Sequence, residues 1–89
     1  YSVKPLPSDI QSALAERFRK LRKAEGYSQT EMAQRSGVSL GSLKRFELTG
    51  QISLESLLKL AYLLDRLDDF MKVFEPGVDM KRIEKLFNS

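Results

Sequence analysis

Residues 28–48, with the sequence SQTEMAQRSGVSLGSLKRFEL, contain the most informative pattern of this chain. It predicts two short helices, about 29–36 and 40–48, which meet at a tight turn at Gly37, where the missing Cβ permits a positive φ. Ser28 precedes the first helix and a glutamate follows three positions later, which is the pattern of a capping box. The stretch is therefore expected to form a pair of helices with a sharp corner between them.

The residues at the contacts of this helix pair are more informative than the helices themselves. Ala33 is small where two helices must cross closely, and Gly37 allows the turn that brings them together. Val38, Leu43 and Phe46 are spaced to bury the pair against the rest of the chain. A generic helical hairpin does not require this combination of small, glycine and apolar positions.

Apolar residues recur at helical spacing on both sides of this stretch. Those from Ile10 to Leu21 predict a helix over about 8–25, with Ser8 as its N-cap. Further helices are expected at 54–64 and 67–74, and Met80, Ile83 and Phe87 favour a short sixth helix. The sequence thus predicts a compact all-α domain of five helices over residues 1–75. Residues 76–89 form an extension that can make a short helix used in dimer or partner contact.

The composition removes several classes of function. The chain has 89 residues and no cysteine or histidine, so disulfides, thiolate chemistry, zinc clusters and the commonest general base are excluded. No glycine-rich phosphate loop or nucleophile motif stands in the sequence, so we expect neither an enzyme nor a metal or cofactor site. No apolar stretch approaches the roughly 20 residues that cross a bilayer, which predicts a cytoplasmic protein without membrane contact.

The charge is unevenly placed along the chain. Residues 1–50 carry nine Lys and Arg against five Asp and Glu, whereas residues 51–89 carry six against seven. The positive field therefore belongs to the N-terminal half, where a polyanion would be attracted. A basic surface alone is weak evidence, because charged helix faces are usually just solvated.

The segment from Ser28 to Ser39, with Leu43 and the pair Phe46-Glu47, resembles the phage repressor and Cro-like (XRE) helix-turn-helix family. The resemblance covers about residues 10–65. It implies a lambda-repressor-like fold that binds double-stranded DNA, with the third helix in the major groove and the second across the backbone. It also implies that Arg22 pairs with Glu47 and holds the helices together.

The resemblance assigns the contacts by position. The candidates for DNA contact are Gln29, Ser39, Leu40, Gly41, Ser42, Lys44 and Arg45. Gln29 and the free amides of its helix would meet a phosphate, and Lys44 would serve nearby phosphates. Arg45 is expected to read a guanine edge. Leu40 and Gly41 depart from the family, whose members often carry amide side chains there, so specificity would lean on Arg45, Ser42 and DNA shape.

Three readings of the function remain open at this point. The first is a sequence-specific transcriptional regulator, a repressor at the nucleoid, that acts as a homodimer through the helix at 67–74 and the extension. The second adds an antitoxin role, in which the same apolar residues bind a toxin protein such as a HipA-like kinase. The third is a helical protein-interaction module that has lost DNA binding, which Leu40 and Gly41 favour.

Overall fold

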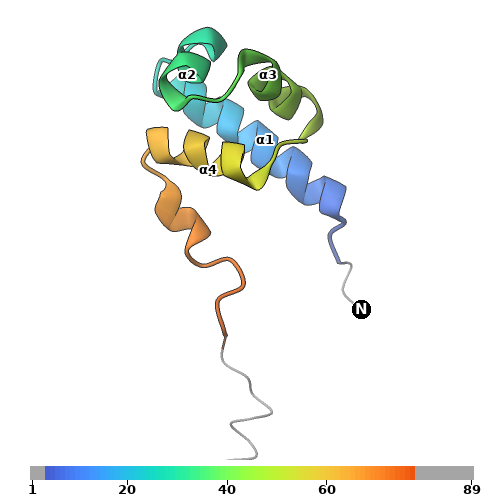
Figure 1. The fold of residues 1–89 in the computed structure, drawn as a ribbon. Helices are drawn as coiled ribbons and strands as arrows, with labels where there is room; N and C mark the ends of the chain where they lie inside the picture. Colours follow the sequence, from blue (N-terminus) through green and yellow to red (C-terminus); the bar gives the residue numbers. More distant parts are fainter. Residues whose placement is uncertain (1–3, 78–89) are drawn as a thin grey trace, which may run out of the picture.

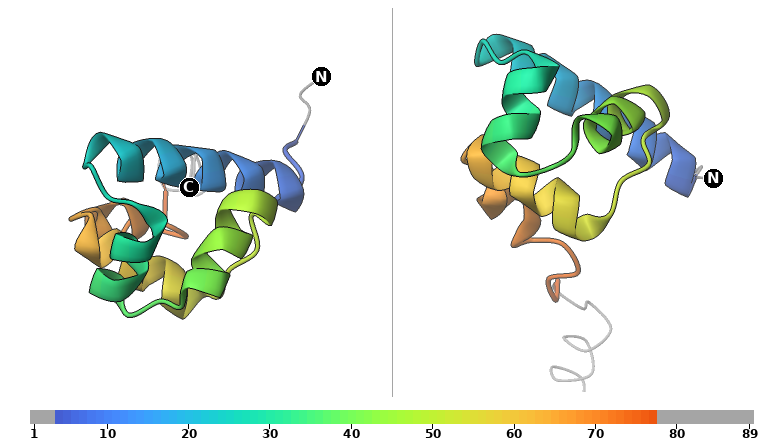
Figure 2. Two further views of the ribbon diagram at one scale, coloured as in Figure 1. Left: turned by 90° about the horizontal axis from the view of Figure 1, so that it is seen from above. Right: turned by 45° about the horizontal axis from the view of Figure 1, so that its top comes forward.

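The computed structural model describes residues 4–77, which contain four α-helices, one short 3₁₀ helix and no strand (Figure 1). The elements are α1 (Pro7–Ala24), α2 (Gln29–Ser36), α3 (Leu40–Thr49), α4 (Leu54–Leu63) and the 3₁₀ helix η1 (Leu67–Phe70). α2 and α3 lie on the same side of α1, and α4 packs on α2 (Figure 2). Within this part of the chain, no helix combines the length and apolar character needed to cross a membrane.

Serine caps start three of the four α-helices, and the cap predicted at Ser28 is confirmed. The Oγ atoms of Ser28, Ser39 and Ser53 accept hydrogen bonds from the backbone N–H three residues later, at 3.0, 3.1 and 3.1 Å. Each cap satisfies one of the amides that the first turn leaves without a partner. Together with Gly37, which has a φ of +78°, they place both ends of α2 and the start of α3 at the expected residues, whereas α3 ends at Thr49, one residue later than expected.

The start of α1 differs from the expectation. Ser8 is not its N-cap; the helix begins at Pro7, and Leu6 occupies the cap position. Proline suits the first helical position because its fixed φ is helical and its missing N–H would have no partner there. Asp9 supplies the polar contact, because its Oδ2 accepts from the backbone N–H of Leu6 at 2.8 Å. The prediction of Ser8 as a cap was therefore wrong by two residues.

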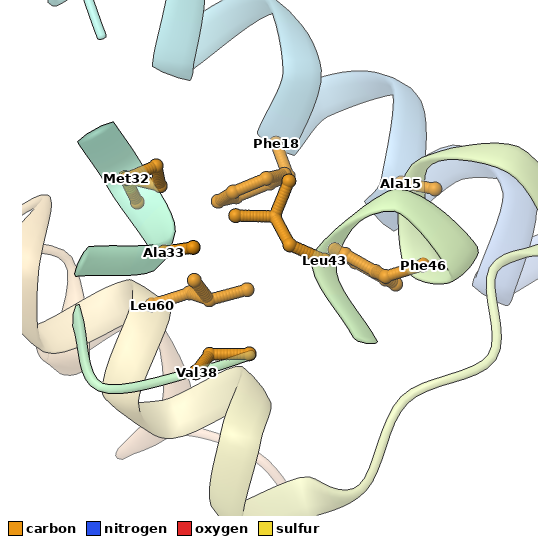
Figure 3. Close-up of a cluster of buried hydrophobic side chains, with 8 residues drawn as sticks. All are labelled: Ala15, Phe18, Met32, Ala33, Val38, Leu43, Phe46 and Leu60. Carbon is orange, nitrogen blue, oxygen red and sulfur yellow. The ribbon is translucent and has the colours of Figure 1, made fainter. Parts of the chain in front are cut away.

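The core lies where α1, α2, α3 and α4 converge (Figure 3). Its members are Ala15, Phe18, Met32, Ala33, Val38, Leu43, Phe46 and Leu60. The rings of Phe18 and Phe46 pack with centroids 5.4 Å apart and planes tilted by 52°. This offset geometry is the favoured one for aromatic pairs. The core confirms the inward positions expected in the helix pair, namely Ala33, Val38, Leu43 and Phe46.

The expected helix at 67–74 is not an α-helix. The structure has only the 3₁₀ helix η1, followed by turns, and Phe74 has a positive φ of 59° and is 100% exposed. A short amphipathic helix needs a surface for its apolar face, and Phe74 meets none among residues 4–77. The five-helix count is therefore not reproduced. The expected sixth helix lies almost entirely outside the described residues.

Candidate nucleic-acid interface

Helix α3 divides its residues between the core and the surface. Leu43 and Phe46 are fully buried, whereas Gly41, Lys44 and Arg45 on the other side are exposed. The division follows from the helical period, because residues three and four apart share a face. α3 therefore presents a surface stripe that is free to meet a partner, backed by the rigid core.

The structure gathers most of the sequence-predicted contacts on this stripe. Ser39, Gly41, Ser42, Lys44 and Arg45 are all exposed on or next to α3. Leu40 is half-buried and packs at the margin of the core, so its side chain is only partly available. Gln29 stands in the first turn of α2 and reaches across to α3, where its Nε2 donates to Oε1 of Glu47 at 3.3 Å.

Ser39, the N-cap of α3, and Ser42 in its first turn form a hydrogen-bonded pair. The Ser39 hydroxyl donates to Oγ of Ser42 at 2.8 Å and also accepts from the Ser42 backbone N–H at 3.1 Å. Ser39 is therefore engaged in capping the helix. Ser42 carries its hydroxyl on the exposed side of the first turn, where it can donate to or accept from a partner.

Arg45 is held by a small polar network at the end of α3. One of its guanidinium nitrogens, Nη2, donates to Oε1 of Gln51. The Thr49 hydroxyl donates to the carbonyl of Arg45 at 2.7 Å and accepts from the Gln51 backbone N–H at 3.1 Å, which fixes the loop that carries Gln51. The sequence reasoning missed Gln51, because a lone amide in a loop gives no periodic signal.

Two polar hollows flank α3. One, of about 280 Å³, is lined by Ser42, Arg45, Gln51, Ile52, Ser53 and Ser56. The other, of about 470 Å³, is lined by Arg19, Arg22, Ser28, Gln29, Lys44, Glu47 and Leu48. Each adjoins the start of a helix, where free amides favour an anion. The second hollow is lined by Gln29, for which a phosphate contact is expected, and also by Arg19 of α1, which was not among the residues expected to contact DNA.

The expected pair of Arg22 and Glu47 is confirmed. Nε of Arg22 donates to Oε2 of Glu47 at 2.7 Å, and Nη2 donates to Oε1 at 2.9 Å. The third nitrogen, Nη1, donates to the carbonyl of Tyr27 at 2.8 Å. The two side chains are only 7% and 6% exposed. The guanidinium of Arg22 thus joins α1, the α1–α2 loop and α3. It therefore fixes the orientation of α3 against the rest of the fold.

Gly50 fixes the other end of α3. Its φ is +80°, and a Cβ at this position would lie 2.9 Å from the backbone carbon of Gln11 in α1. Glycine is thus required here twice, once for the turn and once for the close approach. The sequence suggested only a loop at this point. The contact with α1 shows that the loop is also an anchor.

A helix-turn-helix family model matches residues 18–69, which is more than half of the chain. The chain belongs to the XRE-type helix-turn-helix family. Members of this family are DNA-binding regulators, generally without enzymatic activity, and the chain is a DNA-binding regulator of this type. No curated protein and no solved structure matches it significantly.

The matched residues include the whole of the site. The XRE-type match begins at Phe18 in α1, runs through α2, α3 and α4, and ends within η1. It therefore contains the Arg22–Glu47 pair, Gln51 and every residue that the sequence assigned to DNA contact. The individual contacts of those residues with DNA stay predictions.

Proposed function

We propose that the protein is a sequence-specific transcriptional repressor that inserts α3 into the major groove as a homodimer. The observation that carries the proposal is the exposed stripe of α3, in which Gly41, Lys44 and Arg45 point away from a rigid core. A helix fits the width of the major groove, and its outward side chains then face the base edges. Bound across a promoter in the nucleoid, such a dimer would exclude polymerase.

Arg45 is the base-reading residue in this proposal. Its guanidinium can offer two donors to the O6 and N7 atoms of a guanine, and Gln51 limits the directions in which it points. Ser42 adds a hydroxyl donor beside it. Preorganisation by Gln51 reduces the entropy lost when Arg45 binds a base.

The surroundings of Gly41 favour a role for this glycine in DNA binding. A Cβ built at Gly41 would meet no described atom within 4 Å, and no positive φ requires glycine there. The fold of the free protein therefore has no need of glycine at this position. In the proposed complex, the missing side chain lets the backbone of α3 approach the bases closely.

The phosphate contacts come from the hollow beside α2. Gln29, Lys44 and Arg19 surround the amides at the start of α2, and all three can donate to a phosphate oxygen. These contacts would set the register of α3 in the groove. They carry no sequence information of their own.

The experiment that tests this proposal is selection of bound DNA from a random pool at two salt concentrations. A homodimer predicts an inverted repeat whose half-sites are about 10 base pairs apart, or a multiple of that. The logarithm of the affinity should fall with the logarithm of salt, with a slope of about −0.9 per phosphate contacted. A protein-interaction module without DNA binding would enrich no sequence even at low salt, and that result would refute the proposal.

Two variants separate the two kinds of contact. Arg45→Ala should relax the preference at one base pair per half-site, at a cost of about 1–3 kcal/mol. Lys44→Ala should weaken binding to all sequences and lower the salt slope by about one. If Arg45→Ala instead weakened every sequence equally, Arg45 would be a phosphate contact.

The antitoxin role is favoured by one observation, the exposed apolar residues Met71, Val73 and Phe74. A toxin bound there would form a complex of unequal chains, whereas a homodimer has twice the mass of one chain. Purification from the native host followed by mass measurement distinguishes the two. A second chain present in equal amount would favour the antitoxin role.

A further inference from the structure

An apolar groove of about 850 Å³ lies between α1, α4 and residues 66–73. α1 packs mainly on α3 and α4 mainly on α2, so α1 and α4 leave the space between them open. The groove reaches the core residues Phe18 and Leu60, and the partly exposed Leu14 and Leu57 form its walls. Its lining includes no residue of α2 or α3, so an occupant would leave the DNA-binding face free.

A second apolar surface follows directly along the chain. Residues 71–77, which we call the arm, begin at the edge of the groove, where Lys72 and Val73 line it, and then lead away from the helices in Figure 1 and in the right-hand view of Figure 2. Met71, Val73 and Phe74 of the arm are 77%, 59% and 100% exposed. Apolar side chains that gather on an exposed segment mark a contact surface. An isolated chain of residues 4–77 thus leaves both the groove and the arm uncovered.

Residues 78–89, which follow the arm, have the sequence of a groove-filling helix. Met80, Ile83 and Phe87 recur at spacings of three and four, so a helix over this segment would carry them on one face. At 1.5 Å per residue, a helix of this length spans about 18 Å. The groove wall on α1, from Ile10 to Leu21, spans about 16 Å by the same rise. Length and pattern therefore match the groove.

From these observations we infer that two copies exchange their last residues. Residues 78–89 of each copy fill the groove between α1 and α4 of the other copy. The inference rests on the homodimer of the proposed function and names its interface. A second copy is favoured over the same chain because the arm carries residue 77 away from its own groove. Met71 and Phe74 of the arm are exposed in the single chain, as apolar residues that contact a second copy would be. Such an exchange is two-fold symmetric, as an inverted DNA repeat requires.

Cysteine cross-linking tests the exchange directly, because the chain has no cysteine of its own. Arg17 lines the groove on α1, and Glu84 stands beside the apolar face of residues 78–89. We expect an equal mixture of full-length Arg17→Cys and Glu84→Cys chains to give a covalent dimer on mild oxidation. At most about half of the chains should react, which is the statistical share of mixed pairs.

Arg19→Cys is the matched control. It is also an exposed arginine of α1, two residues away, but it lines the hollow beside α3 instead of the groove. Mixed with Glu84→Cys, it should give little covalent dimer. Equal cross-linking from Arg19→Cys would indicate random collision and overturn the inference. Phe87→Cys provides a second cysteine position within residues 78–89 for the same cross-linking test.

The double variant Arg17→Cys/Glu84→Cys separates exchange from folding back. Exchange predicts a covalent dimer, and a disulfide within one chain would overturn the inference. Sedimentation of the parent chain, alone and on its selected DNA, separates this inference from the proposed function. If the protein is a dimer but cross-links through neither Glu84→Cys nor Phe87→Cys, the groove is not the interface, although the homodimer itself is still supported. A monomer under both conditions refutes the homodimer as well.

Discussion

Helix α3 and residues 67–74 contain similar apolar patterns but have different structures. In α3, Leu43 and Phe46 meet α1 and α2 and are fully buried. After α4, Leu67, Phe70 and Phe74 have the spacing of a helix face, yet only one short 3₁₀ turn forms and Phe74 stays fully exposed. The periodicity of apolar residues therefore shows which face a helix would bury. It does not show whether a surface is present to receive that face.

Polar interactions show the same contrast. The Arg22–Glu47 pair in the helix-turn-helix region is almost fully buried and satisfied by three hydrogen bonds from the guanidinium. The Arg66–Asp69 pair near η1 has a similar separation of 2.9 Å, but both side chains are about half exposed. Geometry alone therefore does not rank the two pairs. Burial does, because water screens the second and not the first.

The largest expected difference between the regions comes from one substitution made in each. Phe46→Ala should lower the free energy of unfolding by about 3–5 kcal/mol, because it opens a cavity against Phe18. Phe74→Ala should change it by less than about 0.5 kcal/mol. Urea unfolding would measure both, at a chain concentration low enough to keep the protein monomeric. Similar losses for the two variants would mean that the arm is part of the folded core.

The two ion pairs provide a second, smaller contrast with isosteric changes. Glu47→Gln should cost about 3 kcal/mol, the low end for breaking a buried pair, because the new amide still accepts one bond from Arg22. Asp69→Asn should cost less than about 1 kcal/mol. Salt distinguishes them further, since only the exposed pair should weaken in 1 M salt. An equal cost for the two changes would contradict the role given to burial.

Local chemistry explains what the sequence could predict. Both ends of α2 and the start of α3 follow from Ser28, Gly37 and Ser39, whose effects operate within a few residues. The inward positions follow from the helical period. The pairing of Arg22 with Glu47, 25 residues apart, was available only through the family resemblance.

Contacts between distant segments explain what the sequence could not predict. The close approach of Gly50 to Gln11 joins residues far apart in the chain, and neither residue type predicts such a contact. Gln51 reaches Arg45 only because the loop is fixed in this way. The lack of an α-helix at residues 67–74 likewise follows from the absence of a surface for their apolar face among residues 4–77, which no local pattern reveals.

Gly50 tests how far α3 depends on its distant anchor. Gly50→Ala combines a positive φ with a 2.9 Å contact to the α1 backbone, and should cost about 2 kcal/mol or more. Gly37→Ala has nearly the same φ, but no described atom lies within 4 Å of the new methyl, so it should cost about 1 kcal/mol. Thermal unfolding of both variants measures the difference. If Gly37→Ala proved as costly, the approach to Gln11 would contribute nothing.

The smallest expected effect on stability has the opposite sign and occurs on the face of α3 that we propose to bind DNA. Gly41→Ala places a methyl in open space on a helix, so it should raise the free energy of unfolding by up to about 0.5–1 kcal/mol. The same methyl would stand between α3 and the bases, so affinity for the selected DNA should fall while the fold becomes more stable. Denaturation and DNA titration of one preparation measure both quantities. Higher stability together with weaker DNA binding would identify Gly41 as a glycine needed for binding. A variant that is more stable and binds DNA with unchanged affinity would show that α3 approaches the bases at another position.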